Sequence, residues 1–270
     1  MAVVIEKFLR GKFDDPERCE DGYVISDAFL AVLDGETDKT GLELAGRSGG
    51  RFAANVLCDG VRDLPPSCNC DEAIEALSDR LEAELAAFDF LTPDRRPGVA
   101  VLIYSVQRDE IWRVGDVRCL IDGSPRYEEK AIDKVASAAR SAHLQALLLG
   151  GATVQSLSAD DPGRQMILPL LQEQWRFRNL ERREPLAFGA IDGRPVPNHF
   201  RERLPVGPGR LVVVVSDGYP VPYGTLVESE DALKRSLDED PLRIGNHAGT
   251  KGVGPGQTSF DDRTYLRFQT

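Results

Sequence analysis

Residues 211–218, LVVVVSDG, constrain the fold of this chain more than any other stretch. Five consecutive apolar residues, four of them valine, predict a β-strand that is buried on both faces. The Ser-Asp-Gly that follows ends the strand abruptly and places the carboxylate of Asp217 at its mouth. Two other stretches repeat this idea: residues 29–35 (FLAVLDG) end in Asp-Gly, and two aspartates stand just before a short alternating strand at 264–268. The sequence therefore predicts several carboxylates fixed at strand ends.

The composition is that of a globular protein and excludes some classes of partner. The chain has 270 residues, of which 41% are hydrophobic and 29% charged, and a formal net charge of −11. That balance disfavours nucleic acid as a partner, since nucleic acid is bound by clustered Lys and Arg. No apolar run approaches the roughly 20 residues of a membrane span, and no secretory leader opens the chain. We therefore expect a cytoplasmic protein that binds neither nucleic acid nor a membrane.

Hydrophobic periodicity and turn residues predict the elements and their order. Short links at 107–109 and 115–116 indicate an antiparallel meander over residues 99–122. Strands cluster at both ends and in the middle of the chain, which is not the alternation of a doubly wound sheet. We predict one α+β domain over residues 1–270, in which two antiparallel sheets form a central sandwich flanked by pairs of helices (four layers, αββα). Strands are expected at 3–9, 23–25, 29–33, 99–106, 110–114, 117–122, 186–191, 211–215 and 264–268, and helices at 51–61, 71–88, 131–149, 165–175 and 231–237.

Seven carboxylates lie at predicted strand ends or in adjacent turns. Two carboxylates about 4 Å apart repel each other by about 4 kcal/mol at an effective dielectric of about 20, so a cluster requires cations or protons. Oxygen ligands suit Mg²⁺ or Mn²⁺, and a pair of such ions supports phosphoester hydrolysis. The alternative for any one Asp-Gly is an ordinary turn; the joint order of the residues favours a cluster. The candidates are Glu20, Asp21, Asp34, Asp116, Asp217, Asp261 and Asp262.

The order of five short motifs carries a family resemblance. The motifs are Cys19-Glu20-Asp21, Ala31-Val32-Leu33-Asp34-Gly35, Gly115-Asp116-Val117-Arg118, Val215-Ser216-Asp217-Gly218 and Asp261-Asp262-Arg263-Thr264. This series resembles that of the metal-dependent (PPM, type 2C) Ser/Thr protein phosphatases, which have a Glu-Asp pair, Asp-Gly after a strand, Gly-Asp-x-Arg, Ser-Asp-Gly and Asp-Asn-x-Thr. The resemblance runs from about residue 20 to residue 268.

The resemblance implies a function and a set of metal ligands. Asp34, Asp217 and Asp261 would hold two Mn²⁺ or Mg²⁺ ions, with Asp34 and Asp217 central to catalysis. Glu20 and the carbonyl of Gly35 would add ligands, directly or through water. Asp116 would help Asp217 to hold a weaker third ion. The activity implied is hydrolysis of phosphoserine or phosphothreonine by in-line attack of a metal-activated water. The substrate would be a phosphorylated protein or a small phosphate ester, with a cognate Ser/Thr kinase as a further partner.

Two departures from the family pattern affect the other site residues. The family's Asp-Gly-His-Gly-Gly, whose histidine is a candidate general acid, is replaced by Asp34-Gly35-Glu36-Thr37-Asp38. A Glu36 with a raised pKa would take over the role of the acid. The family's phosphate-binding arginine is replaced by Pro16. The cation is then expected from Lys251 first, or from Arg18, Arg10 or Lys12. Residues 150–205 fall where the family has a variable flap beside the active site.

Two other functions are compatible with the sequence. Without the histidine and the arginine, the chain could be a phosphatase-like module that binds a phosphorylated partner without turnover. The run that begins at Asp34 is also similar to that of haloacid-dehalogenase-like phosphatases, in which a strand-end aspartate is the nucleophile. That second alternative requires a parallel sheet.

Overall fold

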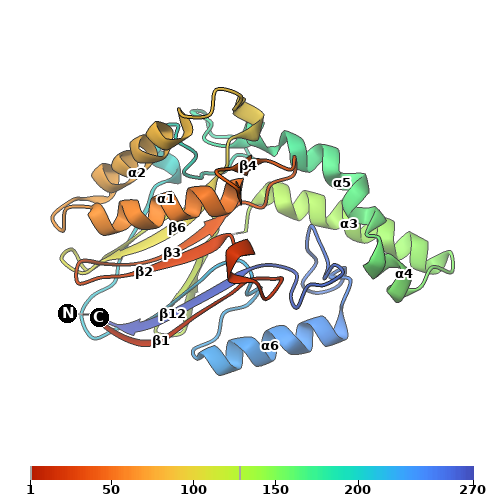
Figure 1. Cartoon of the computed structure of the whole chain (residues 1–270). Helices are drawn as coiled ribbons and strands as arrows, with labels where there is room; N and C mark the ends of the chain where they lie inside the picture. Colours follow the sequence, from red (N-terminus) through yellow and green to blue (C-terminus); the bar gives the residue numbers. More distant parts are fainter. Residues whose placement is uncertain (1, 128) are drawn as a thin grey trace.

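Two five-stranded antiparallel sheets lie face to face in the computed structural model, which describes residues 2–127 and 129–270 (Figure 1). The β3 sheet has the strand order β10-β7-β6-β3-β2, and the β12 sheet has the order β1-β12-β11-β8-β9. The strands are β1 (Val3–Arg10), β2 (Asp21–Ile25), β3 (Phe29–Gly35), β6 (Val99–Ser105), β7 (Glu110–Val114), β8 (Arg118–Ile121), β9 (Ser124–Arg126), β10 (Glu202–Pro205), β11 (Leu211–Val215) and β12 (Arg263–Gln269), with a small hairpin of β4 (Glu43–Leu44) and β5 (Arg47–Ser48).

The alternation of side chains along the strands builds the layers. In β11, Val212 and Val214 point into the core between the sheets, while Val213 and Val215 point to the outer face of the β12 sheet. In β3, Leu30 and Val32 face the same inner core, whereas Phe29, Ala31 and Leu33 face the helices. The prediction that the valine run forms a strand buried on both faces is confirmed.

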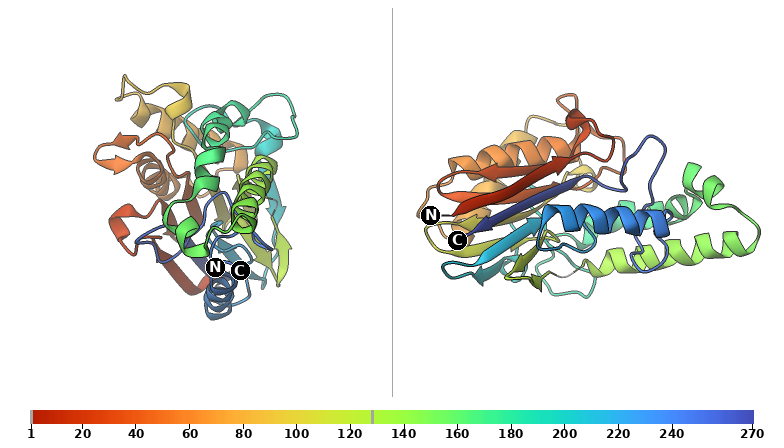
Figure 2. Two further views of the ribbon diagram at one scale, coloured as in Figure 1. Left: turned by 90° about the vertical axis from the view of Figure 1, so that its right-hand side faces the viewer. Right: turned by 90° about the horizontal axis from the view of Figure 1, so that it is seen from below.

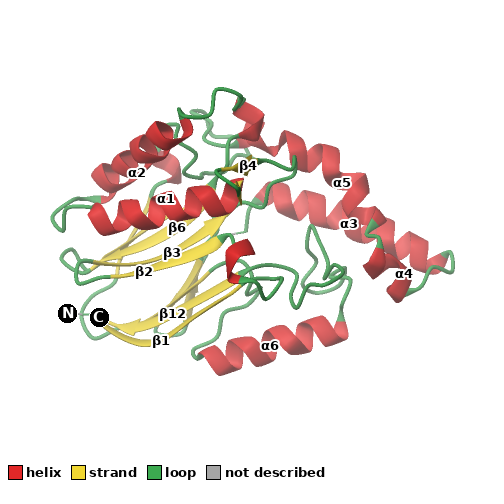
Figure 3. Cartoon of the chain, in the orientation of Figure 1, coloured by secondary structure: helices red, strands yellow, loops and turns green. Residues whose placement is uncertain are grey.

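Helices cover the sheets unequally. α1 and α2 pack on the outer face of the β3 sheet, whereas α6 lies on the outer face of the β12 sheet (Figures 1 and 3). α3 and α5 pack against each other and, with α4, extend beyond the strand ends, on the side opposite the two termini (Figure 2). Within the described residues, no helix is both long enough and apolar enough to cross a membrane. The helices are α1 (Gly49–Asp63), α2 (Cys70–Leu85), α3 (Ala131–Leu149), α4 (Val154–Ala159), α5 (Pro162–Gln172) and α6 (Leu226–Glu239).

The sandwich of two antiparallel sheets is confirmed, and the meander over residues 99–122 is wrong in its last step. β6 and β7 pair as expected, but β8 crosses to the other sheet and pairs with β11. The free edge of β7 is taken by β10, which lies far away in the sequence. Because both sheets are antiparallel, the haloacid-dehalogenase-like alternative is also wrong.

Residues 186–191 do not form the predicted strand. They make only two isolated bridges, at Phe188 and Ile191. A side chain supplies what a neighbouring strand would give: the Asn179 amide donates to the Ala190 carbonyl at 2.8 Å and accepts from the Ala190 N–H at 3.1 Å. Those bonds satisfy the segment locally, so it needs no further strand.

Candidate metal centre

All seven predicted carboxylates lie at one end of the sandwich. Antiparallel pairing puts the start of β2, the end of β3, the β7–β8 turn, the end of β11 and the start of β12 side by side. Asp21 and Asp34, for example, are direct partners across β2 and β3. The predicted convergence of strand ends is therefore found.

Asp34 and Asp217 are the centre of this cluster. The Asp217 N–H donates to Asp34 Oδ2 at 3.3 Å. Burial, followed by the negative charge of Asp217, raises the pKa of Asp34 well above its ordinary value. Burial and the charges of Asp261 and Asp116 raise the pKa of Asp217 to about 6. Negative charge therefore outweighs positive charge around both carboxylates, although Lys251 and Arg118 act in the opposite direction on Asp217.

A cavity of about 90 Å³ opens between these carboxylates. It is lined by Asp34, Gly35, Asp116, Asp217 and Asp261, among other residues. A Cβ on Gly35 would lie 2.5 Å from the Gly50 carbonyl oxygen, so only glycine allows the chain to approach so closely. Carboxylate and carbonyl oxygens suit Mg²⁺ or Mn²⁺. This set of donors, with its surplus of negative charge, fits a divalent cation.

Lysine ammonium groups occupy the other side of the cluster. Lys12 Nζ lies 3.1 Å from Glu20 and 3.5 Å from Asp261, and Lys251 Nζ lies 2.6 Å from Asp261. Although burial alone would raise the pKa of Asp261, Lys251 and Lys12 lower it to about 2. Among residues 2–127 and 129–270, no three carboxylate, imidazole or thiol side chains form a ready-made metal site. Two of the expected ligands, Glu20 and Asp261, form ion pairs with these lysines.

Asp262 and Asp21 support the site through hydrogen bonds to neighbouring segments. Asp262 accepts the backbone N–H groups of Lys12 at 2.7 Å and of Glu20 at 2.9 Å. Asp21 accepts the Thr264 hydroxyl at 2.9 Å, which ties the start of β2 to β12. Both carboxylates are buried, and their hydrogen bonds join segments about 240 residues apart in the sequence.

The raised pKa that was predicted for Glu36 is wrong. Burial alone would raise it, but the positive charges of Arg178 and Lys130 lower the pKa of Glu36 to about 2. Arg178 Nη1 lies 3.1 Å from Glu36, and Lys130 Nζ lies 3.9 Å from it and 3.2 Å from Asp116. An ionised Glu36 has no proton to donate, so we withdraw its role as a general acid.

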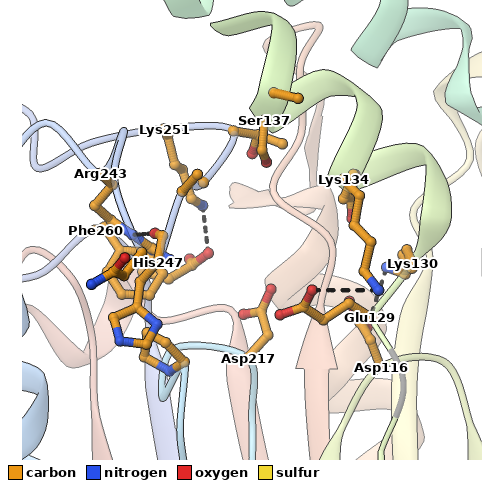
Figure 4. Close-up of a pocket in the computed structure, with 18 of the residues that line it drawn as sticks. Asp116, Glu129, Lys130, Lys134, Ser137, Asp217, Arg243, His247, Lys251 and Phe260 are labelled. Carbon is orange, nitrogen blue, oxygen red and sulfur yellow. Dashed lines mark hydrogen bonds and ion pairs between the residues drawn. The ribbon is translucent and has the colours of Figure 1, made fainter. Parts of the chain in front are cut away.

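A larger cavity of about 320 Å³ adjoins the cluster (Figure 4). Asp217 faces it, between the start of α3 and the 243–251 loop, and Lys251 and Arg243 line it from that loop. The Arg243 guanidinium lies 3.2 Å from the centre of the Phe260 ring, and its Nε donates to the His247 carbonyl at 3.2 Å. Arg243 thus holds a fixed position beside the carboxylates.

The predicted phosphate-binding residues fall in different places. Lys251 lines both cavities. Arg18 does not line them: it is exposed and lies over the Phe13 ring. Three residues of the site were not predicted: Lys130, Arg178 and Arg243 belong to no motif and reach the site only through tertiary packing.

Comparison with solved structures identifies the fold. The chain is similar to the Mycobacterium tuberculosis serine/threonine phosphatase PstP/Ppp, with 18% identity, a TM-score of 0.50 and 99% of each chain covered. It is also similar to the catalytic domain of the serine/threonine phosphatase PstP in complex with 2 manganese ions, with 16% identity, a TM-score of 0.51, and coverage of 100% of this chain and 99% of that one. No family profile and no curated protein matches the sequence. The fold implied by the resemblance is confirmed.

Proposed function

We propose that this chain, which has the fold of the Ser/Thr phosphatases, is a divergent member of their metal-dependent family and hydrolyses phosphate monoesters. One observation carries the proposal: strand-end carboxylates from both sheets meet at a cavity where, among the described residues, neither Asp34 nor Asp217 has an ion-pair partner. Clusters of buried carboxylates with mutually raised pKa values are typical of functional sites. The substrate that we favour is phosphoserine or phosphothreonine in a protein.

The donors that would hold Mn²⁺ or Mg²⁺ are Asp34, Asp217 and the carbonyl of Gly35. A bound ion of this kind supplies an acidified water and polarises a phosphoryl oxygen. Asp116 is proposed only as a weaker ligand, because the ammonium of Lys130 already neutralises its carboxylate.

The chain's own cations would bind and orient the phosphoryl group. Lys251 reaches the small cavity from the 243–251 loop, and Arg243 lies in the larger one, over Phe260. Their positive charges suit the phosphate oxygens. The larger cavity would accept the residues that flank the phosphorylated side chain.

Residues 150–205 are proposed as the variable flap of this domain. Arg178 anchors the segment: its Nη1 pairs with Glu36, and its Nη2 donates to the Arg96 carbonyl at 2.9 Å. This anchor fixes the flap beside the end of β3 and makes it the candidate for substrate selection.

The test is hydrolysis of para-nitrophenyl phosphate and of a phosphoserine and a phosphothreonine peptide, each with Mn²⁺ and with chelator. We expect turnover only with metal. Asp34→Asn and Asp217→Asn should each lower kcat/KM by more than about 100-fold, because even residues behind the ligands of a metal site cost 10–100-fold.

The matched control is Asp59→Asn, a change at an exposed carboxylate of α1. It should leave the activity unchanged, and circular dichroism should show that all three variants are folded. Turnover that persists in chelator, or in both site variants, would contradict the proposal. Metal-independent retention of a phosphopeptide without turnover would instead indicate the binding module.

A further inference from the structure

Lys12 is the most unusual residue of the cluster. It is 5% exposed, yet its ammonium faces three carboxylates: Glu20 at 3.1 Å, Asp262 at 3.2 Å and Asp261 at 3.5 Å. The Thr37 hydroxyl lies within 3.2 Å. Burial alone would lower the pKa of Lys12, but the surrounding carboxylates raise it, so the group stays charged.

The backbone of Lys12 is clamped at the same place. Its N–H donates to Asp262 Oδ1 at 2.7 Å, and its carbonyl accepts the Thr258 N–H at 2.7 Å. A long lysine side chain normally keeps much rotational freedom. Here both the main chain and the ammonium are held, so the charge has a fixed position in the site.

Asp262 and Lys12 act together. In the motif before the last strand, Asp262 stands where the phosphatase family's Asp-Asn-x-Thr has asparagine. The added carboxylate and the buried ammonium compensate each other at 3.2 Å. A buried charge without a partner would be costly.

The carboxylates beside the lysines already have ion-pair partners: Lys12 contacts Glu20, Asp261 and Asp262, Lys251 contacts Asp261, and Lys130 contacts Asp116. Among the described residues, Asp34 and Asp217 form no ion pair, and their two negative charges match the two positive charges of one Mg²⁺ or Mn²⁺. A second ion placed beside Glu20 and Asp261 would be repelled by the positive charge of the Lys12 ammonium.

We propose that Lys12 takes the place of one divalent cation, so that the centre binds one ion, on Asp34 and Asp217, rather than two. This inference rests on the metal centre of the proposed function. It assigns Lys12 the part of a built-in, non-exchangeable cation between Glu20 and Asp261.

The test counts ions rather than turnover. The folded, metal-stripped chain is titrated with Mn²⁺ by calorimetry, and electron paramagnetic resonance then shows whether the bound ions are isolated or coupled. We expect one ion per chain, with the spectrum of an isolated Mn²⁺. Two ions in the wild type, with the spectrum of a coupled pair, would overturn the inference and leave the metal centre standing.

Variants test the role of Lys12 directly. Lys12→Met should raise the count to two, since Glu20 loses its ion-pair partner and Asp261 keeps only Lys251. The double variant Lys12→Met with Asp262→Asn removes both charges together and covers the case in which the single variant fails to fold. Lys251→Met is the matched control: it should leave the count at one, because Lys12 still neutralises Glu20.

Each outcome has a distinct meaning. A count that stays at one in the folded double variant contradicts the role of Lys12. A count of zero in the wild type refutes the proposed metal centre, and the inference with it. Melting curves with and without Mn²⁺ check that each variant is folded.

Discussion

Replacing Arg140 with methionine should destabilise the protein through one buried ion pair. The Arg140 side chain is fully buried in α3, and its Nη2 lies 2.6 Å from Asp161 Oδ2. Its Nη1 also donates to the carbonyls of Arg243 at 3.2 Å and Gly249 at 3.1 Å. One guanidinium thus joins α3, the residue before α5, and the loop that carries Lys251.

The size of the expected loss of stability follows from the carboxylate of Asp161, which Arg140→Met leaves without its partner. Removing one partner of a buried pair costs about 3–5 kcal/mol. The Asp161 side chain is 22% exposed, so water recovers part of its solvation, and we expect the lower end, about 3 kcal/mol. For a chain of this size that lowers Tm by about 6–12 °C.

Urea unfolding and thermal melts measure this loss. The matched control is Arg62→Met, because Arg62 forms an exposed pair with Asp59 in α1 and such pairs contribute about 0–1 kcal/mol. Hydrogen exchange should also accelerate in residues 243–251. If Arg140→Met and Arg62→Met melt at the same temperature, the reasoning from burial is refuted.

Three further predictions follow from the site and its supports. The pKa of Asp217, about 6, lies above its unfolded value of about 3.9; the metal-free protein should therefore lose up to about 3 kcal/mol of stability as the pH rises from about 4 to about 6. Asp217→Asn should remove this loss, so melts in chelator should show a more stable variant at pH 8 and no difference below about pH 4; parallel curves would contradict this. Gly218→Ala places a Cβ 2.0 Å from the Asp262 carbonyl oxygen and should cost about 1–3 kcal/mol in urea unfolding, whereas Gly224→Ala, whose Cβ meets only Glu228 Oε2 at 3.9 Å, should cost much less. Asn179→Gly keeps the positive φ of 56° accessible but removes both hydrogen bonds to Ala190. Hydrogen exchange of the Ala190 amide should therefore accelerate. Unchanged protection of this amide would show that the Asn179 side chain does not hold the segment.

The features that the sequence predicts well are local. β11, β3 and α3 follow from runs of apolar residues and from helical spacing, and they lie within one or two residues of their expected bounds. The strand-end aspartates follow from the same runs, since a carboxylate after a buried strand can point only to the strand's end. The positions of Asp34 and Asp217 at strand ends therefore follow from the sequence alone.

The features that the sequence does not predict depend on distant partners. The three residues between β7 and β8 suggest a hairpin. The edge of β7, however, pairs with β10, about 90 residues later, so β8 joins the other sheet. Gly115, with φ of 90°, allows the chain to make that crossing. Lys12 precedes every motif, and only the folded chain shows that it points into the carboxylate cluster.

The position of β12 has a consequence for how the protein is made. β12 lies between β1 and β11 and pairs with both. A chain still on the ribosome can complete β1 and β11, but their inner edges stay open until residues 263–269 emerge. Exposed strand edges invite wrong pairing, and such long-range sheets form slowly. The same segment brings Asp261 and Asp262 to the site, so the carboxylate cluster is assembled only once translation has passed them, and an unfinished chain cannot display the complete centre.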